Sequence, residues 1–85
     1  MPIEEKFQIV VLDRGFVYVG HTSITGDMCT IRSARCIRRW GTTGGLAQLA
    51  NSGPTPDTKL DGAINIEAPM RAVIHLIDAK EEQWN

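Results

Sequence analysis

The sequence has no long apolar run, almost no net charge and few residues that bind metals. Its 85 residues include two cysteines, two histidines and 6% aromatic residues, and the formal net charge is -1. Without about 20 consecutive apolar residues there is no candidate membrane helix. Two cysteines without a Cys/His cluster supply too few ligands for a zinc site, which normally needs four. We therefore expect no membrane segment, no metal and no cofactor.

The composition fits one small globular domain over residues 1–85. Hydrophobic residues make up 42% and charged residues 22% of the chain, which is typical of globular proteins. Residues 1–6 do not form a secretory signal, so we expect a cytoplasmic protein. Six strand-like residues separate Cys29 from Cys36, too many for a disulfide bond, and we interpret both as small buried hydrophobic residues. Small domains gain stability from disulfides, metals or oligomerisation, so we expect a homo-oligomer.

The alternation of apolar segments and turn residues predicts short strands. Two apolar segments separated by residues 13–15 predict a hairpin. The apolar residues Ile31 and Ala34 are three apart, which breaks the period of two and predicts a bend near Ser33. The predicted strands are 7–12 (covered on both faces), 16–23, 28–32, 34–40, 63–67 (an edge strand) and 72–77 (a central strand).

One short helix is predicted between the fourth and fifth strands. Leu46, Leu49 and Ala50 fall at helical spacing, a preceding threonine can cap the helix, and Gly53 with Pro54 ends it. Residues 80–84 predict one further helical turn. The fold class is therefore mainly β (α+β), with five to six strands and one short helix. Either a small bent antiparallel sheet or a small barrel fits this pattern.

Residues 10–37 resemble the first part of an Sm-like or SH3-like barrel. An apolar strand, a charged turn with glycine, a strand ending in Val-Gly, a polar turn and a bent strand follow in that order. The resemblance covers about a third of the chain and is one of pattern. A helix stands where an Sm-like protein turns tightly, so ring assembly and RNA binding are not carried over.

A second resemblance spans most of the chain. The segment Arg39-Trp40-Gly41-Thr42-Thr43, with a closing apolar strand at 72–77 and the terminal Glu and Trp of 82–84, is similar to a family of short phage and prophage proteins of unassigned function. This resemblance implies a phage origin and expression in the cytoplasm of a bacterial host. It implies no activity.

Positive charge gathers in one stretch of the chain. Residues 28–45 contain four arginines and no acidic residue, whereas the segments before and after are net negative. The segment 38–45 combines this charge with the start of the predicted helix, whose free amide N–H groups attract anions. Glycines allow close approach to a ligand, arginine matches phosphate oxygens and Trp40 offers a face for stacking. Together these features predict a pocket for a phosphorylated, nucleotide-like ligand.

The same residues also have a purely structural interpretation. The threonines and glycines can serve as a helix cap, Trp40 as a core residue and the arginines as a solvated strand edge. Adjacent strand residues point to opposite faces, so Arg38 and Arg39 cannot both enter one pocket, whereas Arg35 and Arg39 share a face. The candidate ligand contacts are Arg39, Trp40, Thr42, Thr43 and Gly44, with Arg35 and Arg38 as electrostatic support.

No catalytic arrangement can be read from the sequence, and we interpret His21 and His75 as structural. We therefore predict a phage-encoded, non-catalytic small-ligand binding protein that sequesters a phosphorylated, nucleotide-like signal of host defence. The alternative is a module that binds single-stranded nucleic acid or a host protein. Nucleic acid is less favoured, because four arginines and one tryptophan face ten acidic residues in the whole chain.

Overall fold

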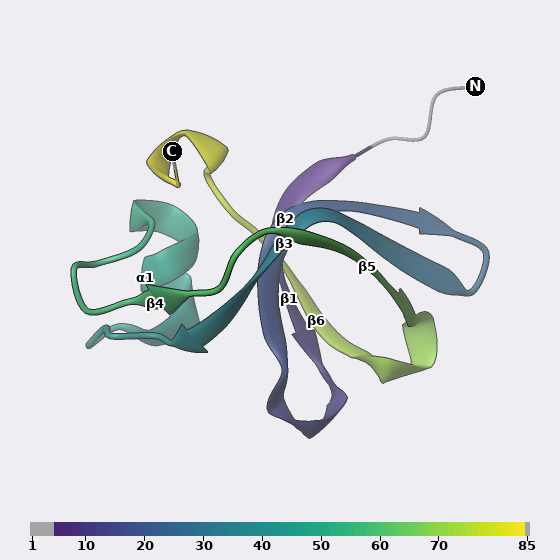
Figure 1. Cartoon of the computed structure of the whole chain (residues 1–85), viewed down its shortest axis with the longest axis horizontal. Helices are drawn as coiled ribbons and strands as arrows, with labels where there is room; N and C mark the ends of the chain where they lie inside the picture. The colour runs from purple at the N-terminus through teal and green to yellow at the C-terminus, as the bar shows by residue number, and fades with distance from the viewer. Residues whose placement is uncertain (1–4, 85) are drawn as a thin grey trace.

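The computed structural model describes residues 5–84, which form one six-stranded antiparallel sheet and one helix (Figure 1). Across the sheet the strand order is β4-β3-β2-β1-β6, and β5 also pairs with β3. The mainly β prediction is confirmed, as a bent open sheet. The elements are β1 (Lys6–Leu12), β2 (Val17–Thr25), β3 (Met28–Arg39), α1 (Gly45–Ser52), β4 (Lys59–Leu60), β5 (Ile64–Pro69) and β6 (Val73–Asp78).

A bulge in β3 bends the sheet. Where two strands were predicted, β3 is one strand of 12 residues. Ser33 has a φ of 55°, and the pairing of β3 with β2 shifts opposite Gly20. The bulge places Ile31 and Ala34 on the same face, since both belong to one buried cluster. The bend predicted near Ser33 is therefore confirmed, as an extra residue within a continuous strand.

Two apolar clusters occupy opposite faces of the sheet. Ile9 and Val10 are neighbours in β1, both are fully buried, and each belongs to a different cluster. This confirms that the strand predicted at 7–12 is covered on both faces. The first cluster is Ile9, Val17, Val19 and Ile37 with Leu49 and Ala50 of α1, and the second is Val10, Cys29, Ile31 and Ala34.

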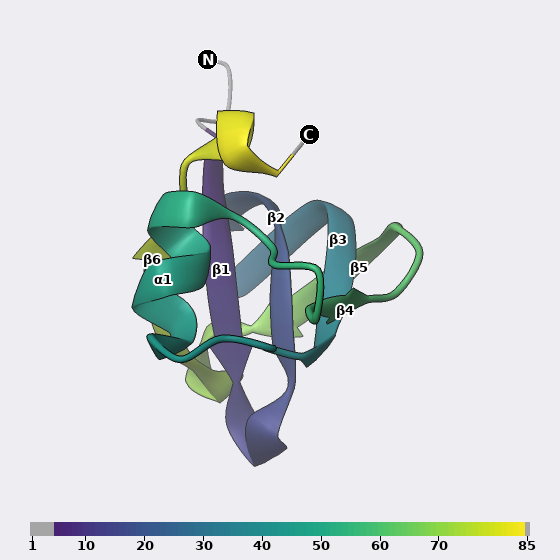
Figure 2. The same cartoon turned by 90° about the vertical axis from the view of Figure 1, so that its left-hand side faces the viewer.

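The helix α1 and the C-terminal segment cover the first cluster. Figure 2 shows α1 standing beside β1, with the C-terminal turn at one end of the helix. Leu49 is fully buried, and the Lys80 amide donates to the Ala50 carbonyl oxygen (2.9 Å). A 3-10 turn (Glu81–Gln83) follows, and Trp84 packs against the cluster. The predicted helix and the predicted helical turn are both confirmed.

The prediction of a central strand at 72–77 is wrong, because β6 pairs with β1 alone among the described strands. Its apolar sequence has another cause. Leu76 packs against the second cluster and Ile77 against the first, so this edge strand contributes to both faces. Ile74 lies where the pairing with β1 shifts, and 56% of it is exposed.

The two cysteines are not joined. Cys29 is buried and Cys36 is half-buried, and both thiols are free. The interpretation as buried hydrophobic residues therefore holds fully for Cys29 and only in part for Cys36. None of the described helices is long and apolar enough to cross a membrane.

The bulge predicts a specific effect of substitution at Gly20. A Cβ atom there would lie 2.9 Å from the Arg32 carbonyl oxygen and 2.9 Å from the Cγ2 atom of Ile31. We expect Gly20→Ala to lower the free energy of unfolding by about 1–3 kcal/mol through overpacking, measured by urea denaturation. Gly62→Ala is the matched control, because a Cβ at Gly62 meets nothing within 4 Å. Equal stability of the two variants would contradict the account.

Candidate functional site

The segment that joins β3 to α1 is bonded to the loop that precedes β4. The Thr58 hydroxyl donates to the Trp40 carbonyl oxygen (2.7 Å), and the Thr55 hydroxyl donates to the Gly41 carbonyl oxygen (2.7 Å). Gly41 has a φ of 64°, and a Cβ there would stand 2.4 Å from the carbonyl carbon of Asp57. Only glycine fits between the two loops at this point, so the backbone beside Trp40 is fixed in place.

Two amide groups at the start of α1 are bonded within the protein, contrary to the expectation that they are free. The Gly45 amide donates to the Thr42 hydroxyl oxygen (3.0 Å), and the Gly44 amide donates to the Gln48 side-chain oxygen (2.7 Å). The helix begins after Gly44, whose own position carries no side-chain cap. The structural interpretation therefore accounts for Thr42 and Gly44, and two fewer donors remain for an anion.

Three of the four clustered arginines have partners within the protein. The Arg38 Nε atom lies 2.8 and 2.9 Å from the two carboxylate oxygens of Asp61, and the Arg35 Nε donates to the Asp61 carbonyl oxygen (3.1 Å). Arg32 makes two bonds of 3.0 Å to the Glu5 carboxylate. The hydrogen bond to Asp61 raises the pKa of Arg38. Two carboxylates, of Glu5 and Asp61, thus neutralise two of the four arginines, and a backbone carbonyl group binds a third.

Arg35 and Arg38 line pockets on opposite faces of the sheet. The Arg35 pocket, of about 180 Å³, includes Val19 of the first cluster. Arg38 lies three residues further along β3 and so points to the other face. Its pocket, of about 470 Å³, includes Tyr18, which packs against the second cluster, and reaches Val17 and Ile37 of the first. The two side chains thus line separate pockets, and Asp61 at the edge of the sheet is bonded to both of them.

Arg39, Trp40 and Thr43 remain at the surface. All three side chains are exposed, the indole to 42%. Within residues 5–84, Arg39 has no ion pair. The structure thus divides the seven predicted site residues into three groups: Arg35 and Arg38 around Asp61, Thr42 and Gly44 at the helix start, and Arg39, Trp40 and Thr43 on the surface.

Sequence reasoning missed Thr55, Thr58 and Asp61 as parts of this region. Each lies between 14 and 26 residues from its partner along the chain. The only signal for them was their presence in the polar segment after Gly53, which follows the helix. That segment indicates a loop, and the sequence of a loop does not predict which carbonyl groups its hydroxyls bind.

The thiols offer no activated nucleophile. Burial raises the pKa of Cys29, and burial together with the charge of Asp61 raises the pKa of Cys36. Both thiols therefore remain protonated and weakly nucleophilic at neutral pH. Among the described residues, no three His, Cys, Asp or Glu side chains gather where they could hold a metal ion.

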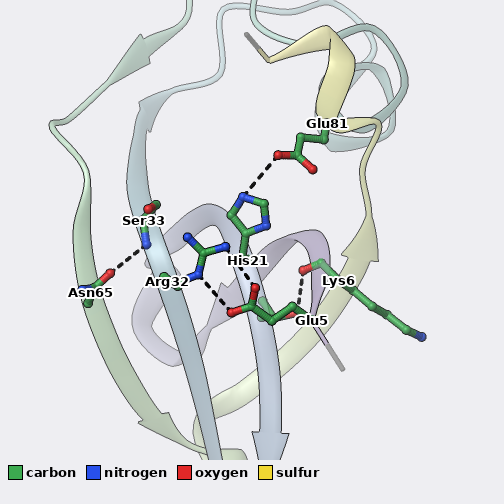
Figure 3. A network of polar contacts seen from close by, with 8 residues as sticks. Glu5, Lys6, His21, Arg32, Ser33, Asn65 and Glu81 are labelled. Atoms are coloured by element: carbon green, nitrogen blue, oxygen red, sulfur yellow. Dashed lines mark hydrogen bonds and ion pairs between the residues drawn. The ribbon is translucent and has the colours of Figure 1, made fainter. Parts of the chain in front are cut away.

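Further polar contacts join the residue before β1 to β3, β2 to the C-terminal turn, and β3 to β5 (Figure 3). Arg32 holds Glu5, His21 Nε2 lies 3.3 Å from the Glu81 carboxylate, and the Ser33 amide donates to the Asn65 side-chain oxygen (2.9 Å). Three segments far apart in the sequence are thereby joined beside the bulge.

The Glu5–Arg32 pair predicts a measurable titration. The hydrogen bond from Arg32 lowers the pKa of Glu5 below its ordinary value. The ionised carboxylate thus favours the folded state above that ordinary value, and the contribution is lost as pH falls through the lowered pKa. We expect Arg32→Gln to raise the pKa of Glu5, followed by NMR of its carboxyl carbon. Arg71→Gln, at an exposed arginine elsewhere, should leave it unchanged, and an unshifted value in Arg32→Gln would contradict the pairing.

Comparison with known proteins gives a family and no activity. Residues 7–85 match a family described as a domain of unknown function, DUF6948. No curated protein and no solved structure matches the chain significantly. The phage origin inferred from residues 39–43 stays a prediction. Because the match covers nearly the whole sequence, the chain belongs to the DUF6948 family.

Proposed function

We propose that the protein is a non-catalytic binding protein for a small phosphorylated ligand that carries a planar ring. One observation carries the proposal: the consecutive residues Arg39 and Trp40 are both exposed, on a backbone fixed by the bond from the Thr58 hydroxyl to the Trp40 carbonyl oxygen. An aromatic face binds a base by stacking, and a guanidinium matches the oxygens of a phosphate group. Trp40 can thus bind the base of a nucleotide, and Arg39 can bind its phosphate group.

The fixed backbone supports binding at so small a surface. Association loses affinity when loops must become ordered, and the carbonyl groups of Trp40 and Gly41 are already held by threonine hydroxyls. Thr43 is exposed in the same segment and supplies a hydroxyl for a further phosphate oxygen. The protonated thiols and the lack of a catalytic arrangement in the sequence support binding without turnover.

The biological role that we propose is sequestration. A protein that binds a nucleotide without converting it lowers the free concentration of that nucleotide. The resemblance to phage proteins suggests a phosphorylated, nucleotide-like signal of host defence in a bacterial cytoplasm. We also propose a homo-oligomer, on the ground that so small a domain has a limited core. A native mass spectrum of the purified chain tests both ideas, because it reports the subunit number and any small molecule that copurifies.

Single-stranded nucleic acid is the less favoured ligand. Such binding requires several phosphate contacts along a basic groove, and acidic or carbonyl oxygens already occupy Arg32, Arg35 and Arg38. Arg39 and Trp40 alone give a footprint of about one nucleotide.

A host-protein interaction module is the second candidate. Phe16 and Ile64 are each 54% exposed and line the Arg38 pocket together. Exposed apolar side chains beside a polar rim are typical of protein interfaces. If Phe16→Ser no longer binds a purified host partner but binds nucleotide unchanged, the interaction module is favoured over the nucleotide-binding protein.

The central test is calorimetry with AMP, ADP and ATP. We expect saturable heat with at least one of them, and recovery of the intact nucleotide after denaturation of the protein. Trp40→Ala should weaken binding by about 1–3 kcal/mol, or roughly 5- to 150-fold, through loss of stacking. Arg39→Gln should weaken it as well, whereas the control Arg71→Gln should not.

Trp84→Phe makes Trp40 the sole tryptophan, so that quenching of its fluorescence reports binding directly. Absence of saturable heat with all three nucleotides would overturn the proposal, and consumption of the nucleotide would indicate an enzyme. Binding of an oligonucleotide that falls steeply with salt, without binding of mononucleotides, would favour a nucleic-acid partner.

A further inference from the structure

One face of the sheet changes from apolar to polar toward the start of β1. Val10 pairs with Leu76, and both pack in or against the second cluster. Two residues earlier on the same face of β1, Gln8 pairs with Asp78 of β6. Lys6 then follows on this face, paired with Thr22 of β2. Since side chains alternate along a strand, these polar groups continue the face whose other end is the buried core.

Two of these polar side chains are buried. Gln8 is 7% exposed and Thr22 is 3% exposed. The Gln8 amide nitrogen donates to the Asp78 carboxylate (2.8 Å), and the Thr22 hydroxyl donates to the Gln8 amide oxygen. Burying polar groups costs free energy unless they are hydrogen-bonded. These bonds fix the orientation of the amide, because its nitrogen must face the carboxylate.

The pair nevertheless retains hydrogen-bonding capacity. A glutamine amide has two N–H groups, and a threonine hydroxyl has one hydrogen and two lone pairs. Asp78 takes one N–H, and the single hydroxyl hydrogen of Thr22 faces two acceptors, the Gln8 amide oxygen and the Lys6 carbonyl oxygen (3.2 Å). In the described part of the chain, the second N–H of Gln8 and the lone pairs of Thr22 have no partner. One buried donor and one buried acceptor therefore stand side by side.

A pocket of about 570 Å³ opens over this pair, within the range of small-molecule sites. We name it the Gln8 pocket. Ile24 and Leu76 supply apolar walls, and Ser23 and Thr25 are also among the lining residues. Lys6 adds a positive charge. In Figure 3 its side chain extends away from the Glu5–Arg32 pair, and Lys6 has no ion pair within residues 5–84.

We infer that the Gln8 pocket binds a small hydroxylated carboxylate, of the class of a sugar acid. The Lys6 ammonium pairs with the carboxylate. The free N–H of Gln8 donates to a ligand hydroxyl oxygen, and the Thr22 oxygen accepts a hydroxyl hydrogen. Ile24 and Leu76 contact the C–H face of the ligand. This site is separate from Arg39 and Trp40, so it does not depend on the proposed nucleotide binding.

The test is NMR titration of the folded chain with D-glucuronate, D-glucose and acetate. We expect glucuronate to shift the amide resonances of residues 6–8 and 22–26 saturably. Glucose, which lacks the charge, should bind roughly fivefold more weakly, the effect of one exposed ion pair. Acetate, which lacks the hydroxyls, should give no saturable shift in these residues.

Two variants separate the parts of the site. Lys6→Gln should bring the affinity for glucuronate down to that for glucose, whereas Lys59→Gln, at an exposed lysine of β4, should change neither. Thr22→Val keeps the shape of the buried side chain and removes its lone pairs, so both sugars should bind more weakly. If Thr22→Val unfolds, the comparison of Lys6→Gln with the unsubstituted protein still tests the site, because Lys6 lies on the surface.

The inference fails if neither sugar gives saturable shifts up to about 10 mM, where a site of millimolar affinity would be nearly full. It also fails if acetate reproduces the shifts of glucuronate, because lysine–carboxylate pairing alone would then explain them. AMP added to the same sample should shift resonances near Trp40 and not those of the Gln8 pocket. The proposed nucleotide site and the proposed sugar-acid site can therefore fail independently.

Discussion

The close approach of Gly20 to the bulge in β3 is the constraint on which the rest of the fold depends. The bulge changes which face the side chains of β3 take, so that Ile31 and Ala34 enter one cluster and Ile37 enters the other. It also lets one long strand pair with β5 along its first part and with β4 near its end. A larger side chain at Gly20 would push the two strands apart where that change occurs.

Most arginines of residues 28–45 make contacts within the protein, and only Arg39 remains exposed without an ion pair among the described residues. Asp61 binds both Arg35 and Arg38 although these side chains line pockets on opposite faces. The anchor at Asp61 holds the loop before β5 against the end of β3. Most of the positive charge in this segment thus holds loops in place, whereas Arg39 and Trp40 remain exposed.

Local features of the fold could be predicted from the sequence, and distant pairings could not. The hairpin, the helix and the bend at Ser33 follow from spacing within a few residues, such as the interval between Ile31 and Ala34. The edge position of β6 did not follow, because an apolar run has the same appearance in a central strand and in an edge strand that serves two clusters. At the candidate site, the bonds of Thr58 to Trp40 and of Asp61 to Arg38 join residues 18 and 23 positions apart, and no local pattern encodes such partners.

The division of the core into two clusters has a consequence for the dynamics of the chain. One face is closed by α1 and residues 79–84. The Lys80 amide bonds the Ala50 carbonyl oxygen of the helix, and the Ala79 amide bonds the Phe7 carbonyl oxygen of β1. Once the bond from Ala79 to Phe7 opens, the helix and the tail can lift as one cooperative unit while the strands around the other cluster stay closed. Amide hydrogens of the helix would then exchange together with those of the tail, ahead of the hydrogens that join β1, β2 and β3.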